Sequence, residues 1–187
     1  MYLPTVESDY YVRCPGVFTP DECQQLIDLM NVSGVHQVAR VWSEKDSQYV
    51  VDPDTRKLVT AIFARDERSA WAFDRLDGWF RHAAEHFRTE ITGKVEEIKI
   101  MKYTPGCHFN TWHRDTGSHA PPRKISISVE LSRPEDYESG SLEIYPFAIR
   151  GALRGAQGSG VAFPSHKYHR VVPVRSGIRY SLVNWTS

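Results

Sequence analysis

The sequence predicts a mainly β domain with flanking helices, built on a double-stranded β-helix, or jelly-roll, core. Helical periodicity is confined to the first half of the chain, and after Gly93 short apolar runs follow one another with no helical stretch between them. Helices first and closely spaced strands afterwards are typical of an antiparallel double sheet. The chain has 187 residues, 41% of them hydrophobic, which is enough for one ordinary core. We therefore expect a single domain over residues 1–187, with N-terminal helices over about 19–92 and the jelly-roll core over about 94–186.

Two helices are expected in the N-terminal half. Thr19 can cap the first, because Pro20 takes the first helical position and Glu22 lies three residues after the cap, which completes a capping box. The second helix is expected within residues 68–92, where apolar side chains recur at spacings of three and four. These side chains are Ala72, Leu76, Trp79, Phe80, Ala83, Phe87 and Ile91. The apolar face that they form should pack on a sheet.

Six runs after Gly93 are predicted as strands: 95–103, 124–131, 141–146, 160–164, 169–174 and 178–185. We expect the last two to form a hairpin through residues 175–177, with Val171 opposite Ser181 and Pro173 opposite Arg179. In this arrangement His169, Arg179 and Ser181 share one face. His169 then lies about 13 Å along the strand from Arg179, a span that suits an extended arginine and a five-carbon diacid.

Charge and targeting features narrow the classes of partner. The 23 basic and 23 acidic residues are interspersed and give no net charge, which argues against a nucleic-acid binder. No apolar run is long enough to cross a bilayer, and the first residues lack the features of a signal peptide, so we expect a cytoplasmic protein without a membrane partner. The three cysteines never fall as C-x-x-C, and buried free thiols are expected.

A candidate metal site lies in the stretch HFNTWHRDTGSH, residues 108–119. His113 and Asp115 are two residues apart, so in a strand they project from the same face. Together they make two thirds of the facial set of two histidines and one carboxylate that holds iron(II). His169 can supply the second imidazole, and Arg179 a guanidinium for the far carboxylate of a keto diacid. His108, His119 and His166 do not fit this facial arrangement and are not expected to be ligands.

In this order, these residues resemble the iron(II)- and 2-oxoglutarate-dependent dioxygenases, and most nearly the prolyl 4-hydroxylase-like hydroxylases. The resemblance covers roughly residues 94–186 and includes KYTPGCHF, RKISISVEL, SGSLEIYP and FPSHKYHRVVPV. It implies iron ligation by His113, Asp115 and His169, and binding of a 2-oxoglutarate carboxylate by Arg179. It also implies cosubstrate contacts for Tyr103 and Ser181. The chain departs from the family pattern at SGSL, where two consecutive glycines are common.

The resemblance further implies an oxygenase that uses iron(II), 2-oxoglutarate and O2, releases succinate and CO2, and hydroxylates a small molecule, an amino acid or a peptidyl side chain. Desaturation and ring closure start from the same hydrogen abstraction and stay open. Asp115 separates the chain from the related halogenases, which have a small residue at this position. Two other classes stay open as well: a non-oxidative metal-dependent jelly-roll isomerase or hydrolase, and a noncatalytic binding jelly roll.

The polar, turn-rich segment between the two expected helices, residues 35–68, has two interpretations. It can form a lid over the mouth of the metal site, or it can be an ordinary strand and loop. The sequence does not distinguish between them.

Overall fold

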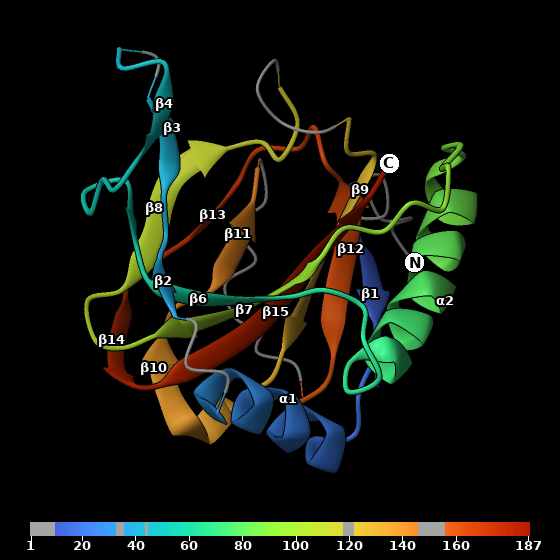
Figure 1. Ribbon diagram of the computed structural model, residues 1–187, viewed down its shortest axis with the longest axis horizontal. Coiled ribbons are helices and arrows are strands. Elements are labelled where there is room, and N and C mark those ends of the chain that lie inside the picture. Colours follow the sequence, from blue (N-terminus) through green and yellow to red (C-terminus); the bar gives the residue numbers. More distant parts are fainter. Residues whose placement is uncertain (1–9, 33–35, 44, 118–121, 146–155) are drawn as a thin grey trace, which may run out of the picture.

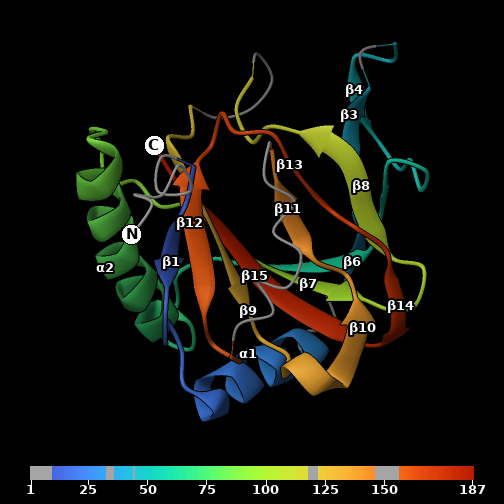
Figure 2. The same ribbon diagram turned by 180° about the vertical axis from the view of Figure 1, so that it is seen from behind.

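A computed structural model describes residues 10–32, 36–43, 45–117, 122–145 and 156–187. Two antiparallel sheets face each other, and helices α1 (Pro20–Val32) and α2 (Ala70–Phe87) cover the outer face of the larger one (Figures 1 and 2). This is the predicted mainly β fold with a jelly-roll core. No helix in the described part of the chain is both long enough and apolar enough to cross a membrane.

The larger sheet has seven strands. In spatial order they are β1 (Val12–Cys14), β12 (Gly160–Pro164), β9 (Ile125–Glu130), β15 (Arg179–Thr186), β7 (Ile98–Tyr103), β6 (Val59–Phe63) and β2 (Gln37–Val38). Strand β9 shows why the sheet has two different faces. Ile125, Ile127 and Val129 belong to the core under the helices, so the alternating residues Ser126, Ser128 and Glu130 face the smaller sheet.

The smaller sheet has four strands, in the order β11 (Leu142–Ile144), β13 (His169–Val171), β8 (His108–His113) and β5 (Arg56–Lys57). Two short ribbons accompany it: β3 (Val41–Ser43) with β4 (Gln48–Val50), and β10 (Tyr137–Ser139) with β14 (Val174–Gly177). A 3-10 turn covers Pro134–Asp136. The space between the sheets holds a second apolar cluster that includes Tyr103, Ile144 and Phe163.

The predicted hairpin between the last two strands is wrong. Strand β13 pairs with β8 and β11 in the smaller sheet, whereas β15 pairs with β7 and β9 in the larger one. Between them, β14 pairs with β10 instead. Alternation of side chains reveals which face of a strand is buried but not which sheet the strand joins. His169 and Arg179 therefore belong to different sheets rather than to one continuous ribbon.

The N-terminal half is less helical than expected. Both predicted helices are present, but strands β2 to β6 occupy much of residues 37–63 between them. Several of these strands are only two or three residues long, which is too short for side-chain alternation to be recognised. The described residues of this segment are therefore short strands joined by loops.

The turn before β11, where the chain departs from the family pattern, has a left-handed backbone. Ser139 has φ 67° and Gly140 has φ 71°. A Cβ atom added to Gly140 would lie 2.6 Å from Cγ2 of Val174, so this position needs glycine for space as well as for backbone conformation. Ser139 takes the left-handed conformation without glycine.

Candidate active site

Strands β8 and β13 bring the three predicted metal ligands together. His113 and His169 are directly opposite each other in the antiparallel pair, and their ring centroids are 4.2 Å apart. Asp115 lies just past the end of β8, where its backbone N–H donates to the carbonyl of Ser165. The ligand atoms of the three residues all lie within 4.8 Å of one another. Asp115 joins the cluster from a bend rather than from the strand itself.

Backbone hydrogen bonds fix the tautomers of both histidines. Nδ1 of His113 lies 2.9 Å from the carbonyl of Thr111, and Nδ1 of His169 lies 3.0 Å from the carbonyl of Lys167. A carbonyl oxygen can only accept, so both Nδ1 atoms carry the hydrogen. Each Nε2 is then left with a free lone pair, which is the atom a metal ion needs.

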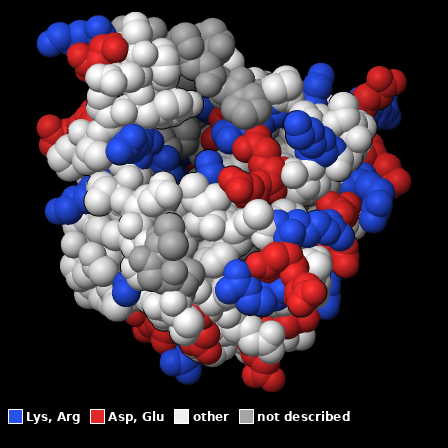
Figure 3. All heavy atoms as spheres, in the orientation of Figure 1, with Lys and Arg blue, Asp and Glu red and all other residues white. Residues whose placement is uncertain are grey.

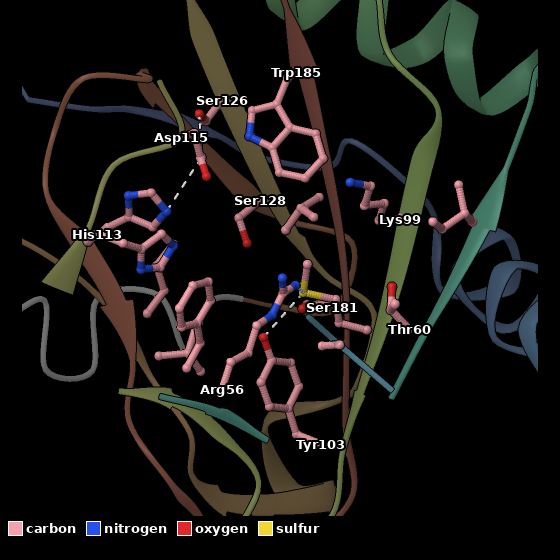
Figure 4. A pocket seen from close by; sticks show the side chains of 18 of the residues that line it. Arg56, Thr60, Lys99, Tyr103, His113, Asp115, Ser126, Ser128, Ser181 and Trp185 are labelled. Atoms are coloured by element: carbon pink, nitrogen blue, oxygen red, sulfur yellow. Dashed lines mark hydrogen bonds and ion pairs between the residues drawn. The ribbon is translucent and has the colours of Figure 1, made fainter. Parts of the chain in front are cut away.

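Asp115 is oriented by two serines that the sequence pattern did not single out. Ser126 Oγ donates to Asp115 Oδ2 over 2.7 Å, and Ser126 Oγ lies 2.9 Å from Ser165 Oγ. The same carboxylate oxygen is 3.4 Å from Nε2 of His169 (Figure 4). The alternating Ser-Ile-Ser-Ile of β9 was the available signal, because small polar residues on one face of a buried strand indicate a polar interior.

The site favours a neutral imidazole beside an ionised carboxylate. Burial, and after it the neighbouring His169, lower the pKa of His113 to about 3. For Asp115, burial opposes ionisation, but the two histidines and the hydrogen bonds hold its pKa at about 2. At neutral pH the cluster therefore offers a deprotonated nitrogen of His113 and a charged oxygen.

The cluster opens into a cavity of about 300 Å³ between the two sheets. Figure 4 shows His113 and Asp115 at one side of this cavity and Tyr103 and Ser181 at another. Arg179 also lines it, so the structure places all six predicted site residues around one space. Strands from both sheets form the wall, as do Val38, Arg40 and Tyr49 from the segment that the sequence left open between lid and loop.

The predicted carboxylate-binding end is built on β7 and β15. Arg179 is directly opposite Tyr103, and its guanidinium lies 5.2 Å from the centre of the Tyr103 ring. Nη1 of Arg179 donates to Ser181 Oγ over 3.4 Å. The Tyr103 hydroxyl, which is buried, donates to Met101 Sδ over 3.3 Å.

Arg179 also has an acidic partner that was not predicted. Its Nε donates to Oε2 of Glu130 over 2.9 Å, and both side chains are buried, with 4% and 5% of their area exposed. Burial alone would lower the pKa of Arg179, but Glu130 and Tyr137 raise it above its ordinary value. The positive charge of Arg179 is thus largely compensated before any ligand binds.

Two further cations face the cavity, Arg56 from β5 and Lys99 from β7 (Figure 4). The Lys99 ammonium lies 4.9 Å from the centre of the Trp185 ring. Burial lowers the pKa of Lys99, and nearby Arg123 and Arg56 lower it further. Arg123 itself is paired with Glu96, over 2.6 Å and 2.7 Å. Apart from the metal-site carboxylate, the cavity is cationic.

The remaining histidines of the stretch are not part of the cluster. His108 begins β8 and its Nδ1 accepts from the backbone N–H of Asn110, while His166 is exposed. Neither belongs to the group of ligand atoms around His113. His119 lies outside the described residues.

Several known proteins that are similar to this chain in sequence are PKHD-type hydroxylases. No family model matches the chain. A PKHD-type hydroxylase of Synechococcus sp. (strain JA-2-3B'a(2-13)) is 41% identical over 96 residues, which cover 49% of this chain and 42% of the relative. A PKHD-type hydroxylase of Pseudomonas fluorescens is 29% identical over 94% of this chain and 77% of the relative. In the match to the Synechococcus protein, and in others like it, the chain spans less than half of the relative's length.

Solved structures show the same fold. A Pseudomonas putida prolyl-4-hydroxylase superposes with a TM-score of 0.70 at 17% identity, over 94% of this chain and 91% of the other. In sequence the chain is thus similar to PKHD-type hydroxylases, and in fold to prolyl hydroxylases. A second fold neighbour, the Trichoplax adhaerens prolyl hydroxylase in complex with a hypoxia inducible factor peptide fragment, gives a TM-score of 0.67 at 18% identity, over 95% of this chain and 83% of the other.

Proposed function

We propose that this chain is an iron(II)- and 2-oxoglutarate-dependent oxygenase that hydroxylates an unactivated C–H bond and releases succinate and CO2. The observation that carries the proposal is a single cavity with a two-histidine, one-carboxylate cluster and several cations, among them the buried Arg179, in its wall. Neither feature alone would be specific. A metal-chelating keto acid with a second carboxylate uses both.

The donor set fits iron(II). His113 and His169 present Nε2 atoms whose protonation is fixed by backbone carbonyls, and Asp115 presents an ionised oxygen held by Ser126. Two imidazoles and one carboxylate bind a divalent ion on one face and leave the opposite positions for other ligands. Bound iron supplies the activation of O2 that breaks the C–H bond.

The other end of the cavity fits the cosubstrate. Tyr103, Arg179 and Ser181 lie together on the larger sheet and offer hydrogen-bond donors to the distal carboxylate of 2-oxoglutarate. The keto-acid end then lies toward the histidines of the smaller sheet. In this arrangement the residues of the chain orient the diacid and keep it out of bulk water, which strengthens each polar contact.

The size of the cavity favours a small substrate. A volume of about 300 Å³ lies at the lower end of ligand pockets, and the cosubstrate takes part of it. We therefore propose a small molecule, an amino acid or one peptidyl side chain as the primary substrate. Among the fold neighbours, the Trichoplax enzyme was solved with a peptide fragment, which supports the peptidyl option.

The test is anaerobic reconstitution with iron(II), followed by addition of oxygen, 2-oxoglutarate and a panel of free amino acids, peptides and peptide-like metabolites. Succinate released in step with one product is the expected result. Under labelled dioxygen with excess chloride, that product should gain one labelled oxygen atom. Loss of two hydrogens instead would replace hydroxylation by desaturation or cyclisation, and incorporation of chlorine would contradict the role given to Asp115.

Two other functions make different predictions. A non-oxidative metal enzyme of the same fold would turn over without 2-oxoglutarate. A noncatalytic binding protein would neither hold iron stoichiometrically nor release succinate. The cations that line the cavity favour the oxygenase over both of these alternatives, because neither alternative needs a site for a distal carboxylate.

A further inference from the structure

Arg56 is a partly buried cation that lacks an anionic partner among the described residues. Its Nε atom is buried without a hydrogen-bond partner, and no carboxylate in the described part of the chain forms an ion pair with it. Its two Nη atoms have only weak acceptors, the backbone carbonyl of Arg40 at 3.3 Å and the sulfur of Met101 at 3.9 Å. An unpaired charge in such a place is costly unless something else compensates it.

The two arginines Arg56 and Arg179 differ in how their charges are compensated. Both guanidiniums line the same cavity and both lie near Tyr103. Arg179 is compensated by Glu130, which raises its pKa, whereas burial lowers the pKa of Arg56 and only Tyr103 and Asp115 oppose the shift. Of these two arginines, Arg179 is thus already neutralised and Arg56 is not.

We propose that Arg56 binds a carboxylate of a ligand in the cavity. This inference rests on the proposed oxygenase function, and it assigns to Arg56 the charge compensation that the resemblance assigned to Arg179. Arg179, with Tyr103 and Ser181, then shapes the same end through hydrogen bonds rather than through net charge.

The position of Arg56 is held by an aromatic ring, which suits a binding residue. In the smaller sheet Arg56 is directly opposite Phe109, and its guanidinium lies 4.7 Å from the centre of the Phe109 ring. That ring stacks in turn on the metal-site imidazole of His113. Figure 4 shows the Arg56 side chain reaching into the cavity beside Tyr103. An aromatic platform leaves the edge of the guanidinium, with its N–H donors, free to face a carboxylate.

Two molecules could supply this carboxylate: 2-oxoglutarate, through its distal end, or the primary substrate. We expect 2-oxoglutarate, because Arg56 and the predicted cosubstrate contact Tyr103 lie on the same side of the metal cluster (Figure 4). The experiment below separates the two sources.

Protein loaded with Mn(II) under nitrogen is titrated by calorimetry with 2-oxoglutarate and with 2-oxobutanoate, which chelates in the same way but has no distal carboxylate. The variants are Arg56→Met, Arg56→Lys and the matched control Lys57→Met, which removes an exposed cation from the next position of the same strand. Arg56→Met should weaken 2-oxoglutarate binding by about tenfold or more and leave 2-oxobutanoate binding within about twofold. Arg56→Lys should give an intermediate loss, because it keeps the charge but not the fork.

A second arm asks about the primary substrate. Acetate is titrated into protein already saturated with Mn(II) and 2-oxoglutarate. If Arg56→Met leaves 2-oxoglutarate affinity unchanged but abolishes acetate binding, the carboxylate comes from the primary substrate. If neither ligand responds more to Arg56→Met than to Lys57→Met, while circular dichroism shows both variants folded, the proposal is overturned.

A third measurement separates this proposal from the oxygenase function. Glutarate is titrated into metal-free wild-type protein and into Arg56→Met. Glutarate binding that depends on Arg56, in a protein that binds no 2-oxoglutarate with metal, would overturn the oxygenase and keep the anion site. Metal-dependent binding of 2-oxoglutarate, together with affinities for 2-oxoglutarate and acetate that do not depend on Arg56, would keep the oxygenase and overturn the anion site.

Discussion

His113 lies flat on Phe109, with 3.6 Å between the ring centroids and 15° between the ring planes. The two residues are four positions apart on β8, and the stack restrains the imidazole ring. Together with the hydrogen bond from Nδ1 to the carbonyl of Thr111, it determines the direction in which Nε2 points.

Replacing Phe109 by Ala should therefore weaken metal binding although Phe109 offers no ligand atom. Loss of such orienting contacts typically costs tenfold or more in affinity, and we expect roughly tenfold for Mn(II). Competition with a chelator measures the change. The control is Phe87→Ala, since Phe87 packs near the helices and away from the cavity. Equal affinities in the two variants would contradict the orienting role.

Replacing His113, Asp115 or His169 by Ala should remove stoichiometric iron and leave the fold largely intact, because all three lie at the wall of a cavity rather than in the packed core. Metal analysis of the purified protein gives the stoichiometry, and circular dichroism gives the fold. His166→Ala, which alters an exposed residue near β13, is the control. Full retention of iron by any of the three variants would remove that residue from the ligand set.

Arg179→Lys should weaken 2-oxoglutarate binding even though the charge is kept. The single nitrogen of an ammonium cannot reproduce the separate Nε and Nη1 atoms with which Arg179 contacts Glu130 and Ser181, nor the planar fork that it offers to a ligand. We expect a loss of roughly tenfold in affinity for the Mn(II)-loaded protein. An unchanged dissociation constant would show that the guanidinium of Arg179 does not contact the cosubstrate.

Glu130→Gln tests the buried ion pair through stability. Removing one partner leaves the other charge buried and unpaired, which costs on the order of 3 kcal/mol in the free energy of unfolding. Urea denaturation at neutral pH measures this loss. Asp77→Asn breaks the exposed pair with Arg65 and should cost less than about 1 kcal/mol. Similar losses in both variants would mean that Arg179 finds another partner when Glu130 is removed.

The metal-free protein should lose stability as the pH falls from about 6.5 toward 3. The pKa of His113 is lowered from 6.5 to about 3 by burial, so in this window the unfolded chain binds a proton that the folded chain does not. The contribution of His113 to stability is intact above pH 6.5 and is lost as the pH falls through this range. Urea denaturation at several pH values should give a shallower dependence for His113→Gln than for the wild type. Parallel curves would contradict the lowered pKa.

Local patterns in the sequence were sufficient to predict six of the strands after Gly93, and together with the family resemblance they grouped His113, Asp115 and His169. The pairing of strands was not predictable in the same way, because β13 and β15 have similar alternation and yet join different sheets. Arg56 was missed because it lies in a turn-rich segment far from the motif, where a lone arginine carries no signal. Glu130 did carry a weak signal in the sequence. It is the only charged residue on the serine face of β9, and a charge on that face requires a buried partner.

The division of the site between two sheets has a consequence for selectivity. The histidines stand on the smaller sheet, and Tyr103, Arg179 and Ser181 stand on the larger one, so a ligand that touches both groups spans the gap between the sheets. Packed sheets lie about 10 Å apart, and close-packed apolar clusters on both sides of the larger sheet keep that spacing constant. The fixed distance between the sheets therefore selects diacids by chain length. Keto diacids one carbon shorter or longer than 2-oxoglutarate carry the right groups, but they cannot contact the residues of both sheets at once.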